Sequence, residues 1–224
     1  MEDLGVVHQL IVPLFGHEMT FNLEPIIMTW IVIIVLLVFG LLATRNKKIV
    51  PGPVQVVGEL FVKQLYGLTE DALVKDLGRK YAPLITALFM FLLFANWIGM
   101  LPHMHEPTKD LNTPLSLGIM GFIIAHYSGI REKGFKTYIK SYFEPIFFMM
   151  PLNLIGELAK VVSISFRLFG NIMGGSIIIL VVSYLTLSLV LPPFLIAFFV
   201  IFIGAIQAFV FTMLTLVYIA VQVN

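Results

Sequence analysis

The sequence has no cysteine among its 224 residues, which excludes a disulfide framework and a thiolate metal site. Charge is also scarce, because Asp, Glu, Lys and Arg make up 12% of the chain, against roughly 25% in an ordinary soluble domain. No basic block with interleaved aromatic residues occurs, so nucleic acid is not expected as a partner. No glycine-rich phosphate-binding loop occurs either. We therefore expect no metal, no cofactor and no nucleotide hydrolysis by the chain alone.

Hydrophobic residues, in contrast, make up 59% of the chain, above the roughly 45–50% of a soluble domain. A soluble fold of this size cannot bury so much apolar surface, whereas about 20 consecutive apolar residues cross a bilayer. The sequence therefore predicts an all-α integral membrane protein, organised as a single membrane domain over residues 1–224. About five transmembrane helices fit, together with one amphipathic helix at the membrane surface.

Apolar runs, charged flanks and proline breaks divide the chain into these helices. The predicted spans cover residues 25–44, 81–101, 115–128, 145–190 and 194–222, and the interfacial helix covers residues 54–76. The third span is short, at about 14 residues, against the roughly 20 that a crossing needs. The interfacial segment alternates apolar and charged residues, and its charges exclude it from the bilayer core.

The basic residues are distributed unevenly across this topology. Of the 14 Lys and Arg residues, 11 fall on one side, Lys109 falls on the other, and Lys160 and Arg167 lie within a predicted span. Basic residues favour the cytoplasmic side, which places the N-terminus outside and the C-terminus inside. Residues 1–24 contain no Lys or Arg, so a cleaved signal peptide is not expected. The lack of an Arg-rich and Ser-rich leader favours a bacterial plasma membrane.

Arg167 lies in the middle of the fourth apolar run. A guanidinium at the centre of a membrane helix costs at least about 2.5 to 3.5 kcal/mol on insertion scales, and it keeps its charge at any accessible pH. A group that offsets this cost is therefore expected. It is either an acidic residue of this chain, in a structural salt bridge, or a carboxylate of a mobile partner helix.

Small and polar residues recur along one face of the helix that carries Arg167, at 100° per residue, while the other positions are apolar. This face consists of Asn153, Gly156, Lys160, Ser163, Arg167, Asn171 and Gly174. Small residues let a second helix approach closely, which is also a feature of ordinary membrane packing. A fixed cation in such a face holds an approaching carboxylate ionised in a low dielectric, and so acts as an electrostatic gate.

Two polar residues accompany this face. Gln207, on the last apolar run, is a candidate to orient Arg167, although glutamines also join membrane helices without any further role. Glu157 lies about 15 Å from Arg167 by helix rise. It is a candidate to relay a proton or bind a hydrated cation, and the alternative is that it only neutralises Lys160, three residues further on.

The loop before the third span gathers His103, His105 and Asp110. These residues either collect ions at an external entrance or are ordinary solvated loop residues. His126, near the end of the third span, is expected at the membrane interface.

Residues 163–171, SISFRLFGN, closely resemble the Arg-Leu-Phe-Gly-Asn signature of subunit a of F-type ATP synthases. Four other segments resemble the same family in the same order along the chain. They are NWIG at 96–99, PTKDLNT at 107–113, PLNLI at 151–155 and GAIQAF at 204–209. The resemblance covers nearly the whole chain.

The resemblance implies a non-catalytic stator subunit that couples the flow of H+ or Na+ to rotation and ATP synthesis. Arg167 would face the essential carboxylate of a rotating c-ring and separate two offset aqueous half-channels. The last two spans would be long, tilted and wrapped against the ring. The implied partners are the c-ring, b-type peripheral stalk subunits and the lipid bilayer.

The resemblance also assigns residues to the ion path. The cytoplasmic half-channel would be lined by Asn153, Glu157 and Ser163. The external half-channel would be lined by Asn171 and Ser176. Gln207 matches the glutamine of the family's final helix.

Three positions depart from the family pattern. Ser176 stands where many members have an acidic residue, and Val200 stands where some have a histidine or an acid. Only Glu157 remains of an acidic pair, beside Gly156. The external half-channel must therefore be lined differently, and the ion is left open between H+ and Na+.

Two other classes of function remain as alternatives. One is a stand-alone membrane channel or secondary transporter in which Arg167 binds an anionic substrate. The other is a structural membrane scaffold in which the polar face is only a packing seam.

Overall fold

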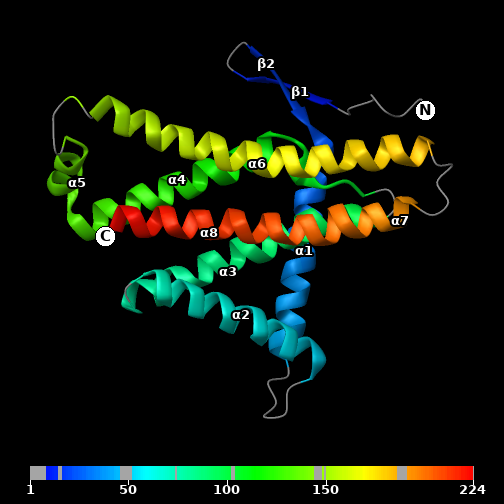
Figure 1. Cartoon of the computed structure of the whole chain (residues 1–224), viewed down its shortest axis with the longest axis horizontal. Coiled ribbons are helices and arrows are strands. Elements are labelled where there is room, and N and C mark those ends of the chain that lie inside the picture. Colours follow the sequence, from blue (N-terminus) through cyan, green and yellow to red (C-terminus); the bar gives the residue numbers. More distant parts are fainter. Residues whose placement is uncertain are drawn as a thin grey trace.

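The structure is a computed structural model that describes residues 9–14, 17–45, 52–73, 75–101, 104–143, 148, 150–185 and 191–223. It is almost entirely helical, as predicted (Figure 1). Within these residues, five helices are long and apolar enough to cross a bilayer, which agrees with the predicted number. These helices indicate a multi-pass membrane protein.

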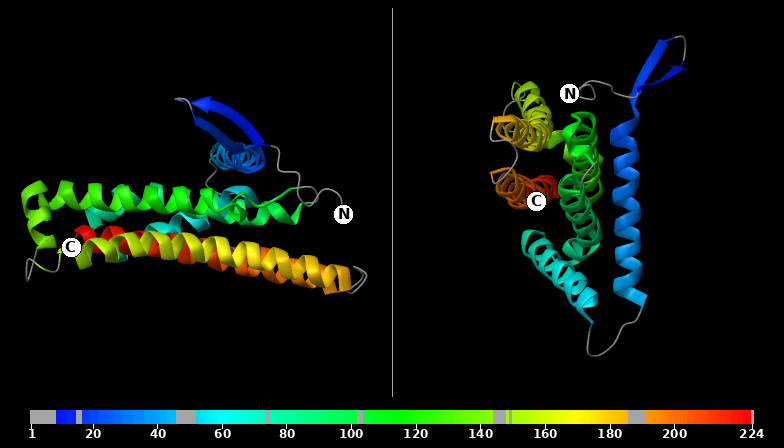
Figure 2. Two further views of the ribbon diagram at one scale, coloured as in Figure 1. Left: turned by 90° about the horizontal axis from the view of Figure 1, so that it is seen from above. Right: turned by 90° about the vertical axis from the view of Figure 1, so that its right-hand side faces the viewer.

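A two-stranded antiparallel hairpin precedes the helices. Strand β1 (Gln9–Leu14) pairs with β2 (His17–Asn22), so that Gln9 lies opposite Asn22 and Leu14 opposite His17. This hairpin is not among the elements predicted from the sequence, because β1 lacks the alternation of apolar and polar residues that β2 shows from Glu18 to Asn22. Helix α1 (Leu23–Arg45) follows directly and stands apart from the other helices (Figure 2). Val32 is its buried residue, so most of α1 is free to face lipid.

Helix α2 (Pro53–Ala72) is the predicted amphipathic helix, and it packs along α3 (Lys75–Trp97). Its apolar face buries Leu65 and Thr69, while its charged residues stay near the surface. The helix ends four residues earlier than the expected limit of 76, because the backbone turns to an extended conformation at Leu73, which is itself buried.

The third crossing differs from the prediction. Helix α4 (Asn112–Lys133) has 22 residues, so it is long enough to span, whereas the apolar pattern marks only residues 115–128. Pattern and structure differ because α4 packs its small residues against other helices and so needs fewer large apolar side chains. A Cβ placed on Gly121 would lie 3.1 Å from Thr215 Cγ2, and one on Gly129 would lie 2.8 Å from the carbonyl oxygen of Gln222.

The chain then forms two long helical segments. Helix α5 (Phe135–Tyr142) leads towards α6 (Met150–Leu185), and a second long segment consists of α7 (Leu191–Ile196), the π-helix η4 (Ala197–Ile203) and α8 (Gly204–Val223). Two short 3₁₀ turns, η1 (Ile98–Met100) and η2 (Pro107–Lys109), connect α3 to α4. A helix of 36 residues is about 54 Å long, but the apolar core of a bilayer is about 30 Å thick. The long helices must therefore tilt.

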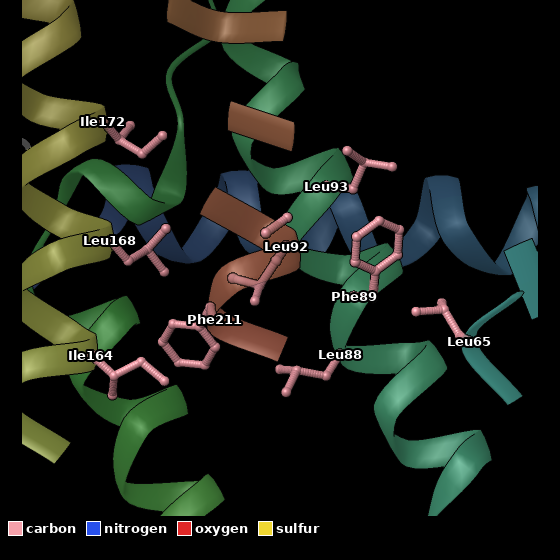
Figure 3. Packing of buried hydrophobic residues seen from close by; sticks show 10 residues of the cluster. Leu65, Leu88, Phe89, Leu92, Leu93, Ile164, Leu168, Ile172 and Phe211 are labelled. Carbon is pink, nitrogen blue, oxygen red and sulfur yellow. The ribbon is translucent and has the colours of Figure 1, made fainter. Parts of the chain in front are cut away.

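The helices form three layers. Figure 1 shows α6 and α8 side by side and steeply inclined to α1, and Figure 2 shows α3 and α4 between that pair and α1. The largest buried cluster joins α3, α6 and α8: Phe211 of α8 packs between Leu168 of α6 and Leu92 of α3 (Figure 3). All three of these side chains are fully buried. This core fixes which face of α6 points inward and which faces outward.

The π-helix η4 is held by side chains of α3. Trp97 Nε1 donates a hydrogen bond to the carbonyl oxygen of Ile201 at 3.1 Å, and Asn96 Nδ2 donates to that of Gly204 at 2.9 Å. A π-helical turn displaces backbone carbonyl groups from regular α-helical bonding, so such side-chain donors stabilise it. The two bonds fix the point at which α8 begins.

Replacing Gly129 by alanine should lower the free energy of unfolding by about 1 to 3 kcal/mol, the usual cost of overpacking. The new methyl group would meet Tyr138 Cε2 at 2.6 Å and backbone oxygen of Gln222 at 2.8 Å. The matched control is Gly67→Ala, where a Cβ meets nothing within 4 Å. That control should be neutral or stabilise by about 0.4 to 1 kcal/mol. Unfolding of the purified chain in mixed micelles measures both, and equal stabilities would contradict the close packing of α4.

Candidate functional site

Arg167 lies on the face of α6 that points away from the rest of the chain. Ile164 and Leu168, on either side of it, are buried in the core, whereas Arg167 itself is exposed. Within the part of the chain that the structure describes, no carboxylate lies within 4.0 Å of its guanidinium and no hydrogen bond joins it. The described residues therefore offer no structural salt bridge to Arg167.

The small residues around Arg167 are not used for packing within the chain. A Cβ placed on Gly156, Gly170 or Gly174 would meet nothing within 4 Å, and Ser163 is exposed. Gly175 belongs to the opposite face, where a Cβ would lie 3.0 Å from the ring of Phe199 on η4. The outward face of α6 thus offers a shallow surface with a single cation near its middle.

Asn171 connects α6 to α8 one turn after Arg167. Its Nδ2 donates a hydrogen bond of 2.6 Å to Oε1 of Gln207, whose side chain is 3% exposed. We expected Gln207 to orient Arg167, but the described contacts give Asn171 as its partner instead. The Nε2 group of Gln207 is buried and has no hydrogen-bond partner among the described residues.

Glu157 forms an ion pair with Lys160 one turn later, with 2.6 Å between Oε1 and Nζ. Lys160 Nζ also lies 5.6 Å from the centre of the Tyr218 ring on α8. The two charges line a small cavity of about 10 Å³ between α4, α6 and α8, which His126 also lines. Neutralisation of Lys160, one of the two expected roles of Glu157, is present in the structure, and the pair points between the helices.

Two other expected path residues lie in different surroundings. Asn153, in the first turn of α6, donates a hydrogen bond of 3.1 Å to the backbone oxygen of Tyr142. Ser176 is half-buried on α6. Val200, one of the three positions that depart from the family pattern, is 7% exposed within η4 and so is packed inside the protein.

Asp110 joins the start of α4 to the end of the hairpin. Its Oδ2 accepts a hydrogen bond of 2.7 Å from Asn22 Nδ2, and its Oδ1 accepts one of 2.9 Å from the backbone N–H of Asn112. Together with Thr29 and Ser116, these residues supply the polar part of a cavity of about 490 Å³ that is open to the surface and that Ile26 and Trp30 also line.

The histidines of the same loop are only partly described. His105 Nε2 lies 3.4 Å from a carboxylate oxygen of Glu24 at the start of α1. His103 lies outside the described residues.

Residues 26–220 match the family model of the ATP synthase A chain. The chain belongs to this family. It is 41% identical over 206 residues to ATP synthase subunit a of Moorella thermoacetica, covering 89% of this chain and 93% of that protein.

Two other bacterial relatives agree with this assignment. ATP synthase subunit a 2 of Bradyrhizobium sp. is 37% identical over 202 residues, which cover 90% of this chain and 89% of that protein. ATP synthase subunit a of Campylobacter jejuni is 37% identical over 196 residues, which cover 85% of each chain. The family predicted from residues 163–171 is therefore confirmed.

The chain also contains a polar cluster that the sequence does not single out. Tyr138 and Tyr142 of α5 contact each other and reach His126 of α4 and Gln222 of α8. Burial raises the pKa of the Tyr138 hydroxyl well above its ordinary value, and the hydrogen bond with Tyr142 acts in the same direction. A tyrosine pair at positions i and i+4 on a short amphipathic helix was the only sequence signal.

The bond between Asn171 and Gln207 is measurable as a coupling energy. Each of Asn171→Leu and Gln207→Leu should destabilise the chain by about 1 kcal/mol, and the double variant should lose about 0.6 kcal/mol less than the sum. Unfolding in mixed micelles provides the four stabilities. A cycle that pairs Asn171→Leu with Thr44→Ala, far away on α1, should be additive. Additivity in both cycles would exclude the bond between α6 and α8.

Proposed function

We propose that this chain is the ion-translocating stator subunit of a rotary F-type ATP synthase, with Arg167 as its electrostatic gate. The observation that supports the gate is the exposed Arg167 guanidinium, which has no partner among the described residues and lies on a face of small residues. Family membership supports the ion-translocating role. The chain supplies the path, and ATP chemistry belongs to other subunits.

The partner of Arg167 in this proposal is the carboxylate of a rotating c-ring. Gly156, Gly170 and Gly174 leave room for a ring helix to pass close to the α6 backbone. As a ring carboxylate reaches Arg167, the guanidinium favours the ionised form and so releases the bound ion. Arg167 keeps its own charge throughout, which prevents an ion from crossing directly between the two sides.

Gln207 and Asn171 extend the gate on its external side. Their hydrogen bond holds the buried Gln207 carboxamide in place behind the face of α6 that carries Arg167 and Asn171. We infer that the external half-channel passes Ser176 and reaches the surface near the cavity at Asp110. Asp110 is the ionisable residue among those that line this cavity.

The cytoplasmic half-channel occupies the other end of α6. Ser163 lies on its exposed surface, and the Glu157–Lys160 pair lies one turn deeper between the helices. Asn153 closes this end by joining α6 to the residues after α5. The path transports H+ or Na+. Because α6 is tilted, the two ends of the path lie apart both along the membrane plane and in depth.

The remaining partners and the orientation follow from the same proposal. The chain lies in a bacterial plasma membrane with its N-terminus outside and its C-terminus in the cytoplasm, as the distribution of Lys and Arg favours. In addition to the c-ring, it binds b-type peripheral stalk subunits, which keep it from rotating with the ring.

Arg167→Ala in the assembled complex should abolish ATP-driven ion pumping and ion-driven ATP synthesis, because the gate between the half-channels is then lost. Arg167→Lys should fail as well, because an ammonium lacks the planar fork and loses its proton more readily when desolvated. Pumping of H+ and Na+ into sealed vesicles is measured with and without a protonophore.

The control is Lys63→Ala, which removes an exposed basic residue of α2 and should leave pumping unchanged. Assembly is checked by the recovery of all subunits in the purified complex. Wild-type pumping by the alanine variant would show that Arg167 is only structural. Ion flux through the purified chain alone would instead indicate a stand-alone channel or transporter.

A further inference from the structure

A chain of hydrogen bonds joins three helices at the end of α4. His126 Nε2 lies 3.1 Å from the hydroxyl oxygen of Tyr142, which in turn lies 3.1 Å from that of Tyr138. The Tyr138 hydroxyl donates to Oε1 of Gln222 at 2.9 Å. These four side chains form one continuous line from α4 through α5 to α8.

Counting hydrogens shows how the directions of these hydrogen bonds depend on the protonation of His126. His126 Nδ1 lies 3.0 Å from the backbone oxygen of Phe122, which can only accept, so Nδ1 carries a hydrogen. Tyr138 uses its one hydrogen on Gln222. With a neutral imidazole and the carboxamide oxygen of Gln222 facing Tyr138, Tyr142 has a single hydrogen for two contacts, and one contact remains empty. With a hydrogen on both ring nitrogens, Nε2–H donates to Tyr142, Tyr142 donates to Tyr138, and every contact is filled.

We propose that His126 is a proton-binding site on the cytoplasmic side of the ion path, and that Tyr142 and Tyr138 relay its proton state to Gln222. The assignment to the ion path rests on the proposed function. The proton-binding site itself rests on the hydrogen-bond geometry alone.

When His126 releases its proton, the donor and acceptor of each hydrogen bond along the line exchange roles. Tyr142 turns its hydrogen to Nε2 of His126, Tyr138 turns its own to Tyr142, and the carboxamide of Gln222 turns so that its Nε2–H donates to Tyr138. One proton leaves, no bond between heavy atoms changes, and every contact is again filled. The burial that raises the pKa of Tyr138 keeps its hydroxyl protonated, so Tyr138 passes its hydrogen on without ionising.

The charged residues that face His126 carry no net positive charge that would oppose its protonation. Glu157 and Lys160 of α6 are paired with each other at 2.6 Å, so together they add no net charge beside the imidazole. Tyr218 of α8 lines the same cavity of about 10 Å³. A cavity of this size, bounded by the imidazole and the Glu157 carboxylate, accommodates about one water molecule. His126 and Glu157 therefore line one cavity.

The first test is a titration of His126 by ¹⁵N NMR in the full chain, labelled at its histidine rings and held in lipid nanodiscs. His126→Gln identifies the signal. We expect both ring nitrogens to become protonated between about pH 5 and 8, the range in which histidine titrates. A single protonated nitrogen throughout that range would overturn the proposal.

Two conservative variants test the relay. Tyr142→Phe removes the acceptor of Nε2–H and should shift the titration of His126 down by about one pH unit. Gln222→Leu should shift it in the same direction by less, because it acts through two hydroxyl groups. Tyr127→Phe is the matched control: Tyr127 neighbours His126 but is 60% exposed and outside the line, so no shift is expected. Equal shifts for Tyr127→Phe and Tyr142→Phe would refute the relay.

Pumping by the assembled complex tests the place of the site on the path. His126→Gln should slow ATP-driven H+ pumping and change its dependence on cytoplasmic pH, whereas Arg167→Ala should abolish pumping at every pH. An unchanged pH profile in His126→Gln, or Na+ uptake that survives a protonophore, would remove His126 from the path. If Arg167→Ala pumps normally while His126 titrates, the proposed gate fails and the proton-binding site stands.

Discussion

Arg167 cannot lose its charge at accessible pH, and within a bilayer that charge has to be balanced by another group. The described part of the chain offers none, and the core directs the guanidinium away from the protein. Ile164 and Leu168 are held by Phe211 and by the residues of α3, so α6 cannot rotate to bury Arg167 without exposing its apolar neighbours. The rest of the fold maintains this orientation.

Small residues divide the structure into two kinds of surface. Gly118, Gly121 and Gly129 of α4 bring α5, α6 and α8 close together, and any added side chain there would meet another atom. The glycines near Arg167 meet nothing in the described chain. The same residue type therefore builds the inner packing of the protein and leaves its outer face open, and the difference depends only on the rotation of each helix.

The spans and the polar face of α6 could be predicted because bilayer thickness and helical periodicity constrain them directly. The length of α4 was underestimated, since Gly118, Gly121 and Gly129 lower its apolar content for reasons of packing that a single sequence does not display. The partner of Gln207 could not be predicted either. Whether it meets Arg167 or Asn171 depends on the relative shift of α6 and α8 by a single turn, which only the tertiary packing sets. The line from His126 to Gln222 joins residues up to 96 positions apart, beyond any local pattern.

The π-helix η4 bears on how a change of chain length before α8 is accommodated. Asn96 and Trp97 attach the carbonyl groups of Gly204 and Ile201 to α3, so the start of α8 is anchored by contacts outside its own helix. Exchange between π-helical and α-helical turns can absorb a residue inserted or lost before Gly204, while Gln207 keeps its orientation. Side chains of η4 counted backwards from Gln207 therefore do not point in the directions that a regular α-helix would give them.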